Sequence, residues 1–388
     1  MQINLLAQIA LGILAMAACL PSMPSWIETF GESQARVQQT FVAYLIAFAF
    51  AQLVYGPASD AFGRRRVLAV GLLIGLAGSL AAVFAQSLDA LIACRALQGA
   101  GTCAGMAIGR AMIQDSFAGP ARTRMMAFVG MVMGLCPPAG TLLGGQLHVS
   151  FGWRASFVAM ALVSALLLVA AWFGLPKNPP LAGRQTGLRD MMRGYRQLLA
   201  DSRYLSFCLV AAFSSATFYV FLAAMPIVLD SYGVPPNRVG WYILFVPTAY
   251  ILGNLLTTRL AGEVEDQRLM RIGQILTVTG VTTVLILAVS GVHHPLAVAT
   301  PLILLGCGHG LLMPPTLVGA VGVVPALAGA AAAMAGMLQQ LIGAAASSLN
   351  GYLDLSSATS MAALMLLLTS LAMVAQFAPG RAPSSGGK

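Results

Sequence analysis

The chain contains twelve apolar stretches that are each long enough to cross a membrane, and these stretches restrict its fold more than any other feature. A transmembrane helix needs about 20 predominantly apolar residues, because the hydrocarbon core of a bilayer is roughly 30 Å thick. The predicted spans are residues 4–24, 38–59, 67–86, 88–111, 125–148, 155–175, 204–228, 238–260, 270–290, 296–323, 326–350 and 357–378. Only 9% of the residues are charged, against about 25% in soluble domains. We therefore predict an all-α membrane protein with twelve transmembrane helices.

The basic residues indicate how these helices are oriented. The chain carries 21 Lys and Arg residues and a net charge of +9. If both termini are cytoplasmic, seventeen of the basic residues, Arg110 among them, lie on the cytoplasmic side, and only Arg36, Arg154 and Arg238 lie outside. Cytoplasmic loops of membrane proteins carry such an excess. The positive charge thus predicts a multi-pass protein of the bacterial inner membrane with both termini in the cytoplasm, and no nucleic-acid partner.

The longest polar interruption divides the spans six and six. We predict an N-terminal six-helix bundle over residues 1–175, a cytoplasmic linker over 176–203 and a C-terminal six-helix bundle over 204–388. Within the linker, residues 188–199 form either a short amphipathic helix on the inner leaflet or a solvated segment.

The two bundles also repeat each other at an offset of 202 residues. Matched pairs fall at the same topological points of both halves: Pro24 with Pro226, Gly31 with Gly233, Arg36 with Arg238, and Gly71 with Gly273. Because the offset covers an even number of spans, the repeats run parallel and are related by an axis along the membrane normal. Transporters built in this way enclose a central cavity between two pseudo-symmetric bundles.

The loop after the second span combines an acid, two glycines and a run of arginines. Asp60, Arg64 and Arg65 can hold helix ends together by charge-assisted hydrogen bonds, while Gly56 and Gly63 allow close approach and a tight turn. These residues predict a cytoplasmic gate. An ordinary basic turn that obeys the orientation rule is the alternative.

Two further spans contain residues that are unusual inside a membrane. Arg95 lies in the fourth span, where a cation is costly and usually faces a cavity or a partner; a side chain that reaches the outer interface near Asp89 is the alternative. The fifth span carries paired prolines and closely spaced glycines, which predict a kinked and tightly packed helix. Its motif residues are Pro137, Pro138, Gly140, Gly144 and Gly145.

Together these motifs resemble the major facilitator superfamily. The loop from Gly56 to Arg66 is similar to the family's signature G-x-x-x-D-x-x-G-R-[RK]-[RKP], which by resemblance assigns the cytoplasmic gate to its acid and arginines. The pattern R-x-x-Q-G-x-G that begins at Arg95 is similar to a motif associated with proton transfer. The prolines and glycines of the fifth span resemble the motif of drug:proton antiporters.

A narrower resemblance joins the chain to the bicyclomycin and chloramphenicol resistance (Bcr/CflA-like) subgroup. It is carried by Leu20-Pro21 and Pro24, by Gln52 to Gly56, and by Gly152-Trp153-Arg154. The resemblance implies multidrug efflux of small amphipathic compounds by alternating access, with proton antiport. The chain departs from the subgroup at Ala17, where an aspartate is usual.

Proton coupling is open on the sequence alone, because all twelve acids fall in loops or at span ends. The candidates for proton coupling are Arg95 and His309, a group that titrates near neutral pH. An uncoupled exporter or facilitator of the same fold is the first alternative. A non-transporting membrane sensor or an enzyme is a remote alternative, since no catalytic motif or phosphate loop is present.

A cavity lined by aromatic residues, Met and a few polar groups would hold amphipathic cargo. The candidate lining residues are Tyr44, Tyr219, Trp241, Asn254, Met313, Gln339 and Gln340. The lack of membrane carboxylates favours neutral or zwitterionic cargo. We expect no cofactor and no metal site, since the six cysteines show no paired ligand spacing, and we expect a monomer in the lipid bilayer.

Overall fold

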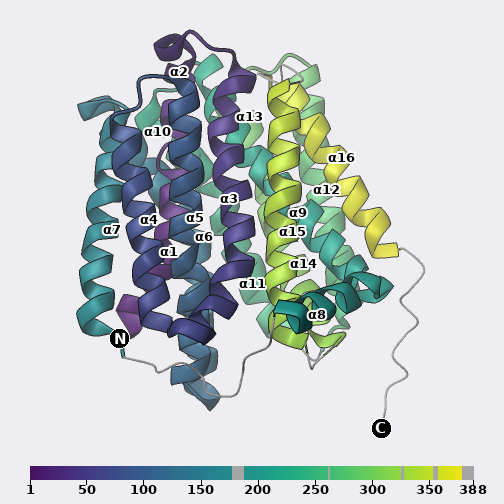
Figure 1. Cartoon of the computed structure of the whole chain (residues 1–388). Coiled ribbons are helices and arrows are strands. Elements are labelled where there is room, and N and C mark those ends of the chain that lie inside the picture. Colours follow the sequence, from purple (N-terminus) through teal and green to yellow (C-terminus); the bar gives the residue numbers. More distant parts are fainter. Residues whose placement is uncertain (177–187, 261–262, 325–326, 353–356, 378–388) are drawn as a thin grey trace.

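A computed structural model shows an all-helical molecule whose long helices run between two opposite ends (Figure 1). It describes residues 1–176, 188–260, 263–324, 327–352 and 357–377. Within this described part, twelve helical stretches are long and apolar enough to cross a membrane. The predicted fold class and the predicted number of spans are confirmed.

The first half of the chain contributes six spans. Its elements are α1 (Gln2–Ala17), the 3-10 turn η1 (Leu20–Ser22), α2 (Met23–Phe30), α3 (Gln34–Phe62), α4 (Arg64–Val83), α5 (Leu88–Ser116), α6 (Gly119–Phe151) and α7 (Arg154–Gly174). A short helix, α8 (Leu188–Ala200), follows. The second half consists of α9 (Ser202–Ser231), α10 (Pro236–Ile243), α11 (Phe245–Leu260), α12 (Asp266–Val289), α13 (Pro295–Ala299), α14 (Leu302–Gly322), α15 (Ala328–Tyr352) and α16 (Ala358–Phe377).

Two names identify the ends of the molecule. The N-terminus and α8 lie at one end, which we call the α8 end, and α2 lies at the other, which we call the α2 end (Figure 1). By the predicted topology the α8 end is cytoplasmic.

The first span is broken near the α2 end and is not one straight helix. α1 stops at Ala17, and the chain continues through η1 into α2. Pro21 has no N–H for the carbonyl of Ala17, and Pro24 has none for the carbonyl of Leu20, so the α-helical pattern fails at both places. The chain tightens instead into a turn in which Ser22 N–H donates to the Cys19 carbonyl at 3.0 Å. As a result, the last carbonyls of α1 need partners from elsewhere.

The two halves repeat each other in their backbone details. Gly31 and Gly233, a predicted pair, both have positive φ, at 65° and 75°. Gly71 and Gly273 both allow close helix packing, because a Cβ at Gly71 would lie 3.1 Å from the Gly101 carbonyl oxygen and one at Gly273 would overlap that of Gly308. The pseudo-symmetry predicted from the sequence therefore extends to how α4 meets α5 and how α12 meets α14.

The halves meet mainly along two seams. α3 packs against α15, and α6 packs against α10 and α11. Gln39 of α3 donates to the Ser348 hydroxyl of α15 at 3.1 Å. These two seams enclose the space between the bundles.

The predicted linker lies only partly within the described residues, since 177–187 fall outside them. Residues 188–200 form α8, so the predicted short helix exists. Its buried residues Tyr195 and Leu198 pack with Tyr204 of α9 and Met334 of α15. The second bundle therefore covers part of the apolar surface of α8, whereas Met192 and Leu199 remain exposed.

Candidate functional site

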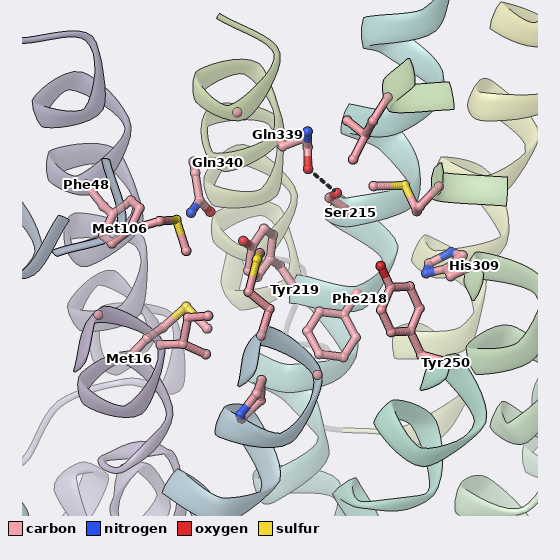
Figure 2. A pocket seen from close by; sticks show the side chains of 18 of the residues that line it. Met16, Phe48, Met106, Ser215, Phe218, Tyr219, Tyr250, His309, Gln339 and Gln340 are labelled. Carbon is pink, nitrogen blue, oxygen red and sulfur yellow. Dashed lines mark hydrogen bonds between the residues drawn. The ribbon is translucent and has the colours of Figure 1, made fainter. Parts of the chain in front are cut away.

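A cavity of about 330 Å³ lies between the two halves. It is lined by α1, α3, α5 and α6 of the first half and by α9, α11, α14 and α15 of the second. Apolar and aromatic side chains dominate its walls, with methionines from both halves (Figure 2). Sites for small ligands are typically concave, mostly apolar and roughly 300–1,000 Å³ in volume.

Five of the seven side chains predicted to line a cavity do line this one. Tyr44 comes from α3, Tyr219 from α9, Met313 from α14, and Gln339 and Gln340 from α15. Figure 2 shows Tyr219, Phe218 and the two glutamines around the same space.

Trp241 and Asn254 do not line this cavity, so their predicted placement is corrected. Trp241 is 60% exposed, because α10 turns its buried residues, Gly240 among them, toward the protein and Trp241 away from it. Asn254 lies one turn beyond Tyr250, the last residue of α11 that reaches the cavity wall. Helix periodicity limits each helix to one cavity-facing stripe, and the sequence does not reveal where that stripe lies.

Two polar groups in the wall of the cavity have no hydrogen-bond partner among the described residues. They are His309 Nε2 and Gln340 Oε1. Both side chains are more than nine-tenths buried, and both belong to the cavity lining. The neighbouring Gln339 differs, since its Oε1 accepts from the Ser215 hydroxyl at 2.9 Å (Figure 2). Buried polar groups without partners are rare, so His309 Nε2 and Gln340 Oε1 have hydrogen-bonding capacity that the described residues leave unused, although the Gln340 side chain also bonds to Tyr219.

Arg95, the other candidate for proton coupling, does not line the cavity. It is fully buried between α5 and the broken end of α1. Its guanidinium donates to the carbonyls of Ala15 at 3.0 Å and Met16 at 3.5 Å, and to Gln98 Oε1. It also lies 4.3 Å from the centre of the Tyr44 ring. A cation beside the last carbonyls of a helix is favourable, so Arg95 caps the end of α1.

A chain of hydrogen bonds extends from Arg95 through the first bundle. Gln98 Nε2 donates to the Ser79 hydroxyl of α4 at 2.8 Å. The Tyr44 hydroxyl bonds to the Gly12 carbonyl at 2.6 Å and to the Thr102 hydroxyl at 2.7 Å. The spacing R-x-x-Q places Gln98 one turn after Arg95, and it is the only trace of the network in the sequence.

The predicted gate loop contains a charged junction centred on Arg64. The guanidinium is mostly buried and lies 2.5 Å from Asp60 Oδ1 and 3.0 Å from Asp115 Oδ2. It also donates to the Ser59 hydroxyl at 2.6 Å. Asp60 and Asp115 lie near the C-terminal ends of α3 and α5, and Arg64 begins α4, so each charge alone would oppose its helix dipole. Pairing removes that conflict and joins three helix ends of the first bundle.

Other members of the loop have separate roles in the structure. Arg65 donates to the Trp172 carbonyl at 2.9 Å and stacks over the Trp172 ring, so it attaches α4 to α7. Gly63 has a φ of 92° and makes the turn between α3 and α4. At Gly56, in contrast, a Cβ would meet no atom within 4 Å, so the close approach expected at this glycine is absent. Sequence reasoning missed Asp115, which is distant in sequence from the loop.

The proline and glycine motif of the fifth span lies in α6. Pro137 lines the cavity, and both prolines stand inside a helix that continues to Phe151. A Cβ at Gly140 would lie 3.1 Å from the Ala17 Cβ, and one at Gly144 would overlap the Ala18 carbonyl oxygen. These glycines therefore let α6 touch the broken end of α1.

Gly145 serves a different contact, between the two halves. A Cβ there would overlap the carbonyl oxygen of Pro236 at the start of α10. Gly240 of α10 approaches α6 in return, with a Cβ position 2.7 Å from the Leu142 amide nitrogen. The halves are thus in backbone contact on the α2 side of the cavity.

Arg110, which the sequence places only on the cytoplasmic side, is a cavity residue in the structure. It lines the cavity from α5, together with Met106 one turn earlier. The positive-inside pattern does not separate a cavity arginine from a loop arginine, because both lie toward the same side of the membrane.

Comparison with known proteins extends over most of the chain. A family model described as Major Facilitator Superfamily matches residues 5–348. The multidrug transporter MdfA of Yersinia pestis bv. Antiqua (strain Angola) is 33% identical over 255 residues, 65% of this chain. That match spans 62% of the relative, less than two thirds of its length. An uncharacterized MFS-type transporter, YdgK of Bacillus subtilis (strain 168), is 27% identical over 95% of this chain and 92% of its own length.

Solved structures share the fold. The xylose transporter XylE from E. coli, in a partially occluded inward open conformation, superposes with a TM-score of 0.74 over 97% of both chains at 13% identity. A bacterial homolog of the human lysosomal transporter Spinster, inward-facing and unoccupied, gives 0.75 over 96% of this chain and 94% of its own at 14% identity.

Proposed function

This chain belongs to the Major Facilitator Superfamily, and we propose from that premise that it exports small amphipathic compounds across the bacterial inner membrane by alternating access. The observation that carries the proposal is the aromatic and methionine-lined cavity between two similar halves. Such walls hold varied apolar bodies without strict shape requirements, because Met side chains adapt and aromatic rings offer broad contact. The multidrug transporters among the relatives support the same cargo class.

The direction of access follows from where the halves touch. On the α2 side, Gly145 and Gly240 bring α6 and α10 into backbone contact. We propose that these contacts close the outer side in this state and separate when cargo is released outward. The junction of Arg64 with Asp60 and Asp115 would steady the helix ends of the first bundle during that movement.

We further propose membership of the drug:proton antiporter group and of the bicyclomycin and chloramphenicol resistance subgroup. The motif residues of α6 and the Leu20-Pro21 break of the first span support this placement. Proton exchange would use His309, the one histidine in the described cavity wall.

An uncoupled exporter is the second candidate, and one observation favours it. No carboxylate is among the residues that line the described cavity. Ala17, where the subgroup usually carries an aspartate, is fully buried beside Gly140. Coupling would thus lack the carboxylate that membrane exchangers commonly use.

Inside-out membrane vesicles that contain the protein can separate the two candidates. The vesicles are first acidified inside by respiration, and chloramphenicol is then added as a neutral aromatic probe. Antiport predicts that the interior pH rises as the compound enters, together with its accumulation. Accumulation with a constant interior pH would favour the uncoupled exporter, and no movement of any amphipath from a broad panel would contradict export itself.

A further inference from the structure

Arg110 sets the charge of the cavity. An arginine remains protonated at any physiological pH. Its side chain lines the cavity from α5, within a membrane span. The contact recorded for its guanidinium is with the Met133 sulfur of α6, at 2.8 Å. A thioether is a weak, neutral acceptor and leaves the charge uncompensated.

The other two arginines of the first bundle that are largely buried have more polar partners. Arg64 pairs with Asp60 and Asp115. Arg95 donates to carbonyls at the end of α1 and to an amide oxygen. Among the described residues, no carboxylate lies within 4 Å of Arg110, and none lines its cavity. Arg110 is therefore the exception, and it is the arginine that faces the ligand space.

The facing wall offers complementary groups. Gln340 Oε1 and His309 Nε2, both on the second half, lack partners among the described residues. Tyr44 and Phe48 of α3 stack with each other at 6.0 Å beside the space between the walls. A molecule that spans the cavity would thus meet a cation on one wall, aromatic surface in the middle and a neutral hydrogen-bonding pair on the other.

We propose that the cargo carries an acidic group, a carboxylate or sulfonate, next to an aromatic body, and that Arg110 binds this group. The inference rests on the proposed export function and narrows its cargo class from neutral or zwitterionic compounds to those with an anionic end. A planar guanidinium matches a carboxylate with two parallel hydrogen bonds. Cationic amphipaths without an acidic group are disfavoured, since nothing on the described cavity wall balances their charge.

Three naphthalene probes of similar size test the proposal by calorimetric binding to the purified full-length protein near neutral pH. They are naphthalene-2-carboxylate, naphthalene-2-carboxamide and 2-naphthylmethylammonium. The carboxylate should bind at least about tenfold more tightly than the ammonium, as expected for one charge-assisted contact. Arg110→Gln should reduce carboxylate affinity to that of the carboxamide and leave carboxamide binding unchanged.

Two matched variants keep the test decisive. Arg110→Lys retains the charge and should retain the preference, although less strongly, because Lys lacks the bidentate geometry. Arg271→Gln removes an exposed arginine of α12 that is outside the cavity lining and should behave as the unaltered protein. Equal binding of carboxylate and ammonium, or an unchanged preference in Arg110→Gln, would overturn the role of Arg110 while leaving export intact. Failure of all three probes to bind would remove the cargo cavity and the inference together.

Discussion

The fourth and tenth spans, α5 and α14, occupy matching positions in the two halves, but their buried polar residues differ in how they are hydrogen-bonded. Gly78 of α4 packs on α5 with its Cβ position 2.5 Å from the Gln98 amide nitrogen, and Gly280 of α12 packs on α14 with its Cβ position 3.3 Å from that of Leu305. By this match Leu302 stands where Arg95 does. The backbone contact is shared, whereas the polar network is confined to the first half.

This difference distinguishes polar residues that support the fold from a polar residue that can bind a ligand. In α5, Arg95 bonds to the end of α1, Gln98 to Ser79 of α4 and Thr102 to Tyr44 of α3, so these groups join four helices around the break in the first span. In α14, His309 occupies the position of Thr102 and its Nε2 lacks a partner among the described residues. A buried polar residue in a membrane helix is thus informative mainly through its partners.

Replacing Arg95 by leucine, the residue at the matching position of the second half, should have the largest effect on stability. Arg95→Leu leaves the carbonyls of Ala15 and Met16 and the Oε1 of Gln98 without their donor. We expect a loss of about 3–5 kcal/mol of stability, as for breaking one partner out of a buried polar set. Thermal unfolding of the purified protein without cargo measures it, with Arg271→Leu as a control expected within about 0.5 kcal/mol. Normal stability combined with lost proton exchange would return Arg95 to a coupling role.

The contact between the halves should be the next most sensitive feature. Gly145→Ala places a methyl group against the Pro236 carbonyl and should cost about 1–3 kcal/mol in the state with the α2 end closed. Spin labels on α2 and α10 should then report a longer distance. Gly130→Ala on the same helix meets open space and should leave the distance unchanged; equal distances in both variants would show that α6 and α10 do not form the closure.

Substitutions in the charged junction of Arg64 test whether transport depends on different contacts in the two halves at the α8 end. Asp60→Asn removes one partner of Arg64 and should lower the transport rate at least about fivefold, corresponding to about 1 kcal/mol, with membrane insertion intact. Asp115→Asn should act in the same direction. Asp266→Asn alters the residue that matches Arg64 in the second half, where an exposed acid begins α12, and should have little effect. An unimpaired Asp60→Asn protein would exclude the gate role.

His309→Leu should change stability least, by no more than about 0.5 kcal/mol, because its Nε2 makes no hydrogen bond with the described residues. If protons are exchanged through this residue, the pH signal in acidified vesicles should disappear while cargo still accumulates. A persistent pH signal would assign coupling to another group.

The sequence predicted the fold well because its determinants are local or periodic. Span length, the excess of basic residues on one side and the repeat of Gly31 with Gly233 are all visible along the chain without knowledge of its neighbours in space. The broken first span could also have been inferred from Pro21 and Pro24, which withdraw two donors in succession.

The site was predicted less completely because its determinants join distant segments. Tyr44 and Gln340 were identified by residue type, but Trp241 was misplaced because helix rotation is set by neighbours. Asp115 and Arg110 were missed for the same reason. Asp115 is separated by 51 residues from its partner Arg64, and Arg110 differs from a loop arginine only in the cavity that it faces. Chemistry that depends on which residues lie opposite cannot be inferred from the spacing along one helix.

The most direct test of alternating access measures the distances within two pairs of spin labels, one pair at each end of the molecule. In a protein without its six native cysteines, one pair joins Thr29 to Arg238 across the α2 end and another joins Phe62 to Leu256 toward the α8 end. On addition of transported cargo, the first distance should gain a longer population while the second gains a shorter one, because the cavity opens to one side as it closes to the other. Unchanged distances at both ends during measured transport would contradict movement of two halves around a shared cavity.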